Sequence, residues 1–398
     1  MFEPMKTKYL KEVELTMLRK LALAVLLMAV IVPISPSHAE EAQNSELVKL
    51  LNNVNVGFYL DTGYEFNFNQ PKSGENQFRS LDPQDNEFEI HAAELSFEKL
   101  PSIEKSVADY VGFRIDLLFG EDANRVSAAG LSSDTVDLTQ AYINVLAPIG
   151  NGLNIYAGKF VTLAGFEVIE SKGNPNITRS FLFGLAIPFT HTGVRLSYPT
   201  GPLTFTVGLN NGWDVVDDNN DGKTIESQVA LDLGIASFYL TGYFGPEQDG
   251  VDGDYRELIT FVGTGNLTDL ITVSFDLDLG WEQGVGQPAG GEKDVFWRGV
   301  AGYVTYEFNP TVSLTVRGEV FKDGDGSRTG FNQRLWEFTP TLSIKPFQDN
   351  KNNLGNLEFR AEYRHDQSDK DVFENDNGGL EDTQDTIALQ LLYSFSED

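Results

Sequence analysis

Apolar and polar side chains alternate, residue by residue, in long segments that recur along most of the chain. In 271–281, for example, Val273, Phe275 and Leu277 share one parity, and Ser274 has the other. Successive side chains of a β-strand point to opposite faces, so each segment has an apolar face and a polar face. The pattern therefore predicts an all-β protein. It also occurs in 111–119, 203–210 and 357–364.

A soluble β-sandwich shows the same alternation, so further features must separate it from a membrane barrel. The alternating segments are about ten residues long, which suits a tilted strand that crosses a bilayer, whereas soluble strands average about five or six. Aromatic residues near predicted strand ends suit an interfacial girdle: Trp281, Trp297, Tyr393 and Phe395. We favour a transmembrane antiparallel β-barrel.

The final alternating strand, Ile387 to Phe395, resembles the C-terminal signal that the outer-membrane assembly machinery reads. It departs from the usual pattern in two ways. Three residues, 396–398, follow the last aromatic, and Gln390 stands where glycine is usual.

The predicted barrel has about sixteen strands, within a range of about 14 to 18, and closure of a bacterial single-chain barrel requires an even number. The least supported turn is at Gly234, where two segments nearly run together. The predicted strand cores are 54–68, 87–98, 109–119, 136–146, 153–161, 190–198, 203–212, 224–233, 235–245, 255–265, 270–282, 294–307, 311–322, 331–345, 355–366 and 384–395.

Connections between these segments alternate in length, with 346–354 as a mild exception. Short turns belong to the periplasmic end of such a barrel and long loops to the exterior. The predicted short turns are 148–152, 199–202, 265–269 and 309–310. The predicted external loops are 69–86, 120–135, 162–189, 213–223, 246–254, 283–293, 323–330 and 367–383.

The N-terminus has the features of a secretory signal peptide. Arg19 and Lys20 precede the apolar run 21–34, and Ser37-His38-Ala39 then places small residues at the positions that a signal peptidase reads. The run is too short for a membrane-spanning helix, which needs about 20 residues. Met17 is an alternative start. We expect a signal peptide at 1–39, a short periplasmic segment at 40–53, and the barrel at 54–398 with a long third external loop, 162–189.

Composition excludes several classes of protein. The chain has no cysteine, so it has neither disulfides nor thiolate metal sites. Its net charge of −30 argues against nucleic acid as a partner, because binding phosphates needs a basic face. The mean hydropathy is −0.23, and no apolar run beyond the signal peptide is long enough for a spanning helix.

Charged residues of both signs fall on the polar parity of the predicted strands. These charged residues have two equally good interpretations. They pair with one another and stiffen the wall, or they determine ion selectivity. Together with two charged residues of the third long loop, the pore-lining candidates are Arg114, Asp116, Lys159, Lys172, Arg179, Arg195, Asp276, Asp278, Arg298, Arg317, Glu319, Glu358, Arg360, Glu362 and Arg364.

Most of the acidic excess lies in the long loops, where it keeps the rim solvated. Asp217, Asn219, Asp221 and Gly222 match the first half of an EF-hand loop. The twelfth position is Gln228, so the required bidentate glutamate is missing. We reject an EF-hand, expect no cofactor, and leave open weak calcium binding at the loop surface.

The third long loop contains the apolar cluster Phe181-Leu182-Phe183. Such a cluster should seek burial, because it would otherwise form an exposed apolar patch. Long loops in compact proteins are usually functional, which favours folding into the lumen. A contact at the rim or with another subunit is the alternative.

Four segments form a recognisable series of motifs: Gly158-Lys159-Phe160, Gly165-Phe166-Glu167, 188–198 and 211–223. Together they resemble the putative beta-barrel porin-2 family of OmpL-like porins. The resemblance covers essentially the whole mature chain. It implies an outer-membrane barrel with a pore, but no known substrate and no binding residues.

We therefore expect a porin in the outer membrane of a Gram-negative cell, with a water-filled channel for passive diffusion of small hydrophilic solutes or ions. A non-conducting adhesin or scaffold is the alternative, although about sixteen strands should enclose an aqueous lumen. A barrel hydrolase is disfavoured because none of His91, His191 and His365 accompanies a Gly-x-Ser-x-Gly motif. The expected partners are outer-membrane lipids, the assembly machinery, small solutes and further copies of the chain.

Overall fold

The computed structural model describes residues 54–104, 107–131, 135–286, 291–348 and 356–396. Its strands are β1 (Asn55–Asn67), β2 (Glu87–Lys99), β3 (Val111–Phe119), β4 (Val136–Ala147), β5 (Leu153–Val161), β6 (Thr190–Thr200), β7 (Leu203–Asn210), β8 (Thr224–Asp232), β9 (Ala236–Pro246), β10 (Tyr255–Thr268), β11 (Ile271–Gly286), β12 (Glu292–Asn309), β13 (Val312–Asp323), β14 (Gln333–Ile344), β15 (Leu357–Ser368), β16 (Phe373–Glu374), β17 (Leu380–Glu381) and β18 (Thr383–Ser396). The short helices are η1 (Val107–Tyr110), α4 (Glu121–Arg125), η2 (Ser171–Gly173) and η3 (Leu182–Ala186).

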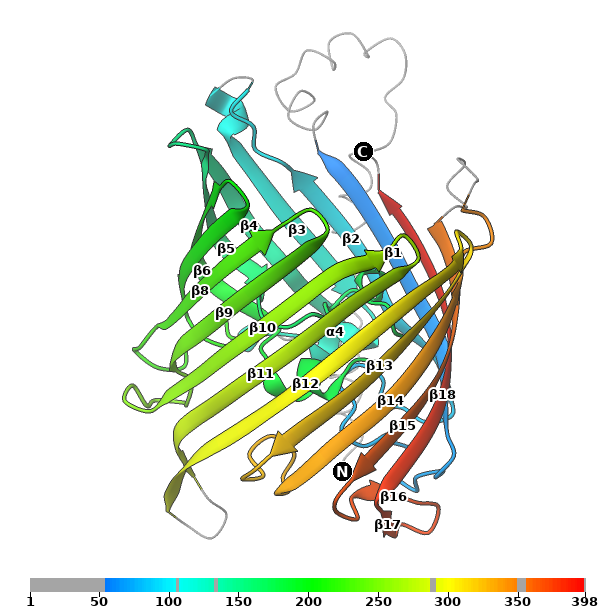
Figure 1. The fold of residues 1–398 in the computed structure, drawn as a ribbon. Coiled ribbons are helices and arrows are strands. Elements are labelled where there is room, and N and C mark those ends of the chain that lie inside the picture. Colours follow the sequence, from blue (N-terminus) through cyan, green and yellow to red (C-terminus); the bar gives the residue numbers. More distant parts are fainter. Residues whose placement is uncertain (1–53, 105–106, 132–134, 287–290, 349–355, 397–398) are drawn as a thin grey trace, which may run out of the picture. The chain divides into compact units, whose positions relative to one another are not determined.

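Sixteen of these strands form a closed antiparallel barrel, as Figure 1 shows. Each strand pairs with its neighbours in the chain, and β1 closes the ring by pairing with β18, for example Leu60 opposite Tyr393. Closure leaves no edge strand, so every strand has two hydrogen-bonding neighbours, as the apolar core of a bilayer demands. The predicted fold class and strand number are confirmed.

The alternating pattern places apolar side chains on the outer surface of the barrel. On β7, Phe205, Val207 and Leu209 point outward and are about half exposed, at 45%, 50% and 53%. On the opposite parity, Thr206 and Asn210 point inward and are buried. This outward apolar surface suits contact with lipid, and polar residues face the lumen.

The two ends of the barrel differ in the length of their connections (Figure 1). The start of β1 and the end of β18 lie at the end with the short connections, whose tight turns are 148–152, 201–202, 233–235, 269–270 and 310–311. The turn at Gly234, with φ of 79°, is confirmed. The turn predicted at 265–269 is shorter, because β10 continues to Thr268.

The connections at the opposite end contain structure that the alternation does not predict. Helix α4 follows β3 directly, and the small hairpin of β16 and β17 lies between β15 and β18. None of the helices among the described residues is long and apolar enough to cross a membrane. The predicted signal peptide and the segment 40–53 lie outside the described residues.

Two predictions on β12 are wrong, because the parity of this strand is the opposite of the one assumed. Trp297 points into the barrel and is fully buried, so it is no part of an interfacial girdle. Arg298 therefore points outward, between Phe296 and Val300, and does not line the lumen. Phe296 and Val300 are both more than a third exposed, as expected of the lipid-facing side.

The asymmetry of the two ends yields a test of orientation. An epitope tag inserted after Asn377, in the exposed hairpin turn, should bind antibody on intact cells. A tag inserted after Gly201, in an exposed turn of the opposite end, should bind antibody only after the outer membrane is permeabilised. Antibody binding to the Gly201 tag alone on intact cells would invert the orientation.

Candidate pore site

The connection between β5 and β6, residues 162–189, folds into the barrel, and we name it the inner loop. Its two ends meet where the Thr162 amide donates to the Phe189 carbonyl at 2.9 Å. Between them, the loop makes hydrogen bonds with inward side chains of the wall, from Tyr243 on β9 to Tyr59 on β1. The prediction that this loop enters the lumen is confirmed.

Two buried carboxylates of the wall bind the backbone of the inner loop. Glu319 on β13 accepts hydrogen bonds from the Phe181 amide at 2.7 Å and the Leu182 amide at 2.6 Å. Glu362 on β15 accepts from the two successive amides of 177–178 at 2.7 and 3.0 Å. Each carboxylate thus satisfies two N–H groups that have no strand partner, and such charge-assisted bonds are about twice as strong as neutral ones.

Arginines of the wall bind the carbonyls of the same stretch. Arg317 on β13 donates to the Thr178 carbonyl at 2.6 Å and to the Glu167 carboxylate at 2.8 Å. Arg364 on β15 donates to the Arg179 carbonyl at 2.5 Å. The loop backbone is therefore held from both of its polar sides by β13 and β15.

The apolar cluster of the inner loop is buried against the wall. Phe181 and Leu182 are fully buried, and Phe183 is 3% exposed. Leu182 packs over Gly299 on β12, where a Cβ atom would lie only 2.5 Å from the leucine side chain. The Arg364 guanidinium lies 4.8 Å from the centre of the Phe181 ring, in cation–π contact.

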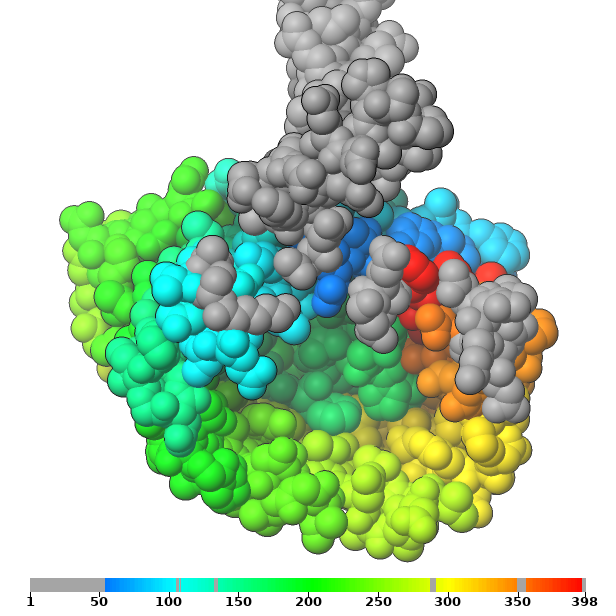
Figure 2. Space-filling model, turned by 90° about the horizontal axis from the view of Figure 1, so that it is seen from above, coloured from blue at the N-terminus to red at the C-terminus, as the bar shows by residue number. Residues whose placement is uncertain are grey.

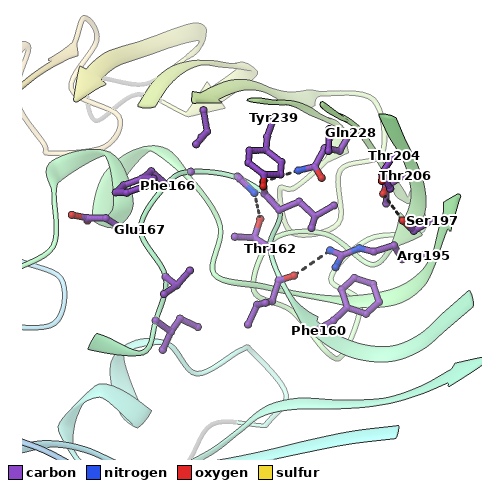
Figure 3. A pocket seen from close by; sticks show the side chains of 18 of the residues that line it. Phe160, Thr162, Phe166, Glu167, Arg195, Ser197, Thr204, Thr206, Gln228 and Tyr239 are labelled. Atoms are coloured by element: carbon purple, nitrogen blue, oxygen red, sulfur yellow. Dashed lines mark hydrogen bonds between the residues drawn. The ribbon is translucent and has the colours of Figure 1, made fainter. Parts of the chain in front are cut away.

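A water-accessible cavity of about 820 Å³ remains between the inner loop and strands β3 to β10. Figure 2 shows the hollow from the end with the short connections, and Figure 3 shows the cavity at close range. The strand wall contains many uncharged polar side chains, which a search of the sequence for charged residues alone missed, although their inward parity was readable. They are Gln140, Tyr142, Tyr156, Ser197, Thr204, Thr206, Gln228, Tyr239 and Thr264.

Toward the long connections, the inward side chains of the wall become buried. Along β6 the inward side chains change from half-buried Ser197 to fully buried His191, and along β9 from half-buried Tyr239 to fully buried Tyr243. The His191 and Tyr243 rings stack at 4.7 Å between centres. The Tyr243 hydroxyl accepts from the Leu163 amide at 2.9 Å, which fixes the first residues of the inner loop here.

Comparison with known proteins identifies the family. The pattern of the family described as putative beta-barrel porin-2, OmpL-like, matches residues 53–395. The chain belongs to this family. It is an outer-membrane porin, and the predicted family resemblance is confirmed. No curated protein matches the chain.

Solved structures of other porins share the fold. An anion-selective porin from Comamonas acidovorans has a TM-score of 0.58 at 11% identity, over 86% of this chain and 99% of its own. A loop L8 deletion mutant of OmpT from Vibrio cholerae has a TM-score of 0.54 at 11% identity, over 86% and 99%. The outer membrane channel DcaP of Acinetobacter baumannii has 0.53 at 12% identity, over 86% and 97%.

Of the pore-lining candidates on the porin's strands, two contribute to the cavity wall. Arg114 is 27% exposed there and pairs with Asp116 at 2.8 Å. Arg195 pairs with Glu226 at 2.6 Å and lies 4.0 Å from the centre of the Phe160 ring. Both cations therefore reach the cavity with a carboxylate already bound.

Most other candidates lie in buried contacts away from the cavity. Lys159 pairs with Asp137 at 3.2 Å. Asp276 accepts from the Phe166 amide at 2.9 Å, behind the inner loop, and Asp278 is fully buried beside it. The side chain of Arg179 donates to carbonyls within the loop, whereas that of Lys172 is 39% exposed.

Mutual ion pairing, one of the two interpretations of the charged candidates, is present in the wall. Arg114 pairs with Asp116, and Arg360 pairs with Glu358 at 2.7 Å. Arg317 pairs with Glu337 at 2.8 Å, and Arg364 pairs with Asp366 at 2.6 Å. The candidates Glu319 and Glu362 bind loop amides instead.

Three carboxylates beside the cavity come close enough to hold a metal ion. Oxygens of Glu94, Asp116 and Glu170 lie within 4.8 Å of one another. The Arg114 guanidinium lies 2.8 Å from Asp116 and 3.9 Å from Glu170, and Lys172 lies 3.8 Å from Glu94. These two side chains already supply positive charge, so the cluster is an ion-pair network within the porin.

Two loop carboxylates fix the point where the inner loop meets the next long connection, 211–223. Asp214 accepts from the amides of Phe189 and Thr190 at 2.9 and 2.8 Å, and burial raises the pKa of its carboxyl to about 6. Glu247 accepts from the Trp213 amide at 2.7 Å, and burial raises its pKa to about 7. Both groups lie outside the strands.

We predict that this junction is more stable in acid. A carboxyl with a pKa raised above its unfolded value of about 4 stabilises the fold fully below that pH. The contribution disappears as the pH rises through the folded values of about 6 and 7. Hydrogen-exchange protection of the Phe189, Thr190 and Trp213 amides, corrected for intrinsic rates, should fall between pH 5 and pH 8.

The matched control is the double variant Asp214→Asn, Glu247→Gln, in which the two ionisations are removed. Its protection at these amides should not depend on pH over the same interval. Protection in the native protein that stays constant or rises with pH would contradict the assignment.

Proposed function

We propose that this porin conducts small hydrophilic solutes by passive diffusion through the half of the lumen next to β3–β10. The observation that supports this proposal most is the water-accessible cavity of about 820 Å³ beside the inner loop, whose strand wall carries hydroxyl and amide groups. The inner loop occupies the opposite half, bound to β13 and β15. The passage is thus confined to one side, and the buried, stacked rings of His191 and Tyr243 lie on two of its wall strands, toward the long connections.

The wall of this passage suits neutral or weakly charged solutes. Hydroxyl and amide groups of Thr204, Thr206 and Gln228 can exchange hydrogen bonds with water and with polar solutes. The cations that reach the cavity, Arg114 and Arg195, are paired with carboxylates. Paired charges leave a smaller net field than a row of unpaired arginines.

The proposed diffusion needs no reaction and no cofactor. Weak calcium binding by the acidic loops stays a prediction of the sequence. So does assembly into a homo-oligomer, for which the trimer form solved for OmpT of Vibrio cholerae offers a precedent in a protein of similar fold. Each of these properties is independent of the proposed passage.

A single cysteine tests the position of the passage, because the native chain contains none. Thr204 points into the cavity, and Phe205, next to it on β7, points outward. In planar bilayers, a bulky charged thiol reagent should reduce the single-channel conductance of the Thr204→Cys variant by a large fraction. The same reagent should leave the Phe205→Cys variant unchanged.

The outcome that would contradict the proposal is equal conductance of both labelled variants after complete modification of Thr204→Cys. Mass spectrometry measures the extent of that modification. Absence of any conductance from the refolded, native-sequence barrel would favour the alternative of a closed scaffold.

Ion selectivity should be weak and should depend on salt. The wall arginines are paired, so they do not create a strong anion preference. The acidic loops lie beyond the passage and act on ions only when screening is weak, and the Debye length is about 8 Å at physiological salt. Reversal potentials across a KCl gradient should be near zero around 1 M and should shift toward cations around 0.05 M. Strong anion preference at both salts would show that arginines of the passage act unpaired.

A further inference from the structure

Three cations lie side by side on the outer surface of the barrel. In the antiparallel register, Arg298 on β12 is opposite Lys322 on β13, and Lys322 is opposite Arg334 on β14. All three have the outward parity of their strands. We name these residues the cation row.

The cation row is unusual because like charges directly opposite one another destabilise a sheet. The inward arginines Arg317, Arg360 and Arg364 all have carboxylate partners. Among the described residues, no ion pair involves a member of the cation row. Lys322 donates to the Asn332 side-chain oxygen at 3.1 Å.

One acidic residue lies at the end of the cation row. Asp369 follows β15 and accepts from the backbone amide of Arg334 at 2.9 Å. Three cations beside one carboxylate leave an excess of positive charge on a chain whose net charge is −30. An external anion would relieve the repulsion within the row.

The surface next to the cation row is apolar. The next outward row in the register contains Val300, Val320 and Trp336. The row after that contains Gly302 opposite Gly318, flanked by Phe338. These glycines form a shallow trough, because a Cβ atom on Gly302 would meet nothing within 4 Å and one on Gly318 only a backbone oxygen at 3.9 Å.

A groove of about 550 Å³ joins the cations to the apolar surface. It is lined by all three members of the cation row and by Val300 and Val320. Trp336 and Phe296 are exposed beside it, at 37% each, as aromatic side chains are at the level of lipid headgroups. The cations therefore lie at the depth of the lipid headgroups, and the trough of Gly302 and Gly318 lies at the depth of the acyl chains.

We propose that the cation row binds the phosphate of a phosphorylated glycolipid of the outer leaflet, with an acyl chain along the trough of Gly302 and Gly318. Arginine and lysine form charge-assisted hydrogen bonds with phosphate oxygens. The cation row lies at the end with the long connections, which we expect to face outward. A free phosphate ion would use the cations alone and would leave the trough without a role.

The test measures binding of lipid A to the purified barrel in detergent by native mass spectrometry. The triple variant Arg298→Gln, Lys322→Gln, Arg334→Gln should bind more weakly. Each cation near a phosphate surface is worth about a fivefold change in affinity, so the triple variant should lose on the order of a hundredfold. Its single-channel conductance should stay at the native value.

The matched control removes the same charge from exposed lysines at the same end of the barrel. Lys72→Gln, Lys223→Gln, Lys293→Gln should bind lipid A as the native protein does. Equal binding by the cation-row variant and this control would overturn the proposal. So would conversion of a native oligomer to monomers by the cation-row variant without loss of lipid A, because the surface would then contact another copy.

A second variant separates the lipid from a free ion. Gly302→Leu fills the trough on the outer surface, where there is room for the side chain. It should weaken binding of lipid A while every cation remains. Competition by millimolar inorganic phosphate against the native protein should have little effect. Full displacement of lipid A by phosphate, or unchanged binding by Gly302→Leu, would reduce the site to a phosphate site and overturn the lipid proposal.

Discussion

Buried backbone N–H and C=O groups need hydrogen-bond partners, and this need determines the structure of both the barrel wall and the inner loop. In the wall, closure between β1 and β18 gives every strand a partner on each side. Inside the barrel, the backbone of the inner loop has no strand partner. Side chains of the wall make the hydrogen bonds that a neighbouring strand would otherwise make. Glu319 and Glu362 accept hydrogen bonds from its amides, and Arg317 donates a hydrogen bond to one of its carbonyls. Removal of either carboxylate would leave two buried N–H groups unpaired, and each unpaired group costs about 1–3 kcal/mol.

This use of the wall charges limits what they can do for passing solutes. A charge that binds the loop backbone or a neighbouring side chain contributes little free field to the passage. Breaking a buried pair by removing one partner costs about 3–5 kcal/mol, so these charges are poorly suited to exchange partners with an ion. On its strand side, the part of the lumen left to water is instead lined by hydroxyl and amide groups, such as those of Thr204 and Gln228, and apolar side chains of the inner loop, such as Phe166, line the other side. Strands β13 and β15 therefore hold the inner loop, whereas strands β3 to β10 form the wall of the proposed passage.

The strands were readable from the sequence because a period of two is a local property of a few residues. Even the least supported turn, at Gly234, is present, and the burial of Phe181 and its neighbours followed from their apolar character. The partners of the charges were not readable in the same way. Arg317 finds Glu337 through the register with β14 and Glu167 through the inner loop, and neither lies near it in the sequence. Parity failed on β12, where aromatic residues occupy both faces.

Two adjacent residues on β12 show that the two faces of one strand have different partners. Trp297 points inward and donates to the Ala186 carbonyl at 3.1 Å, so it helps to hold the inner loop. Arg298, one residue further, points outward beside two other cations. Inside the barrel, the protein itself supplies a partner for each arginine that holds the loop. On the outer surface, one carboxylate, that of Asp369, lines the groove of the three cations, which leaves positive charge for the proposed lipid phosphate. The same strand is thereby tied to the loop on one face and to lipid on the other.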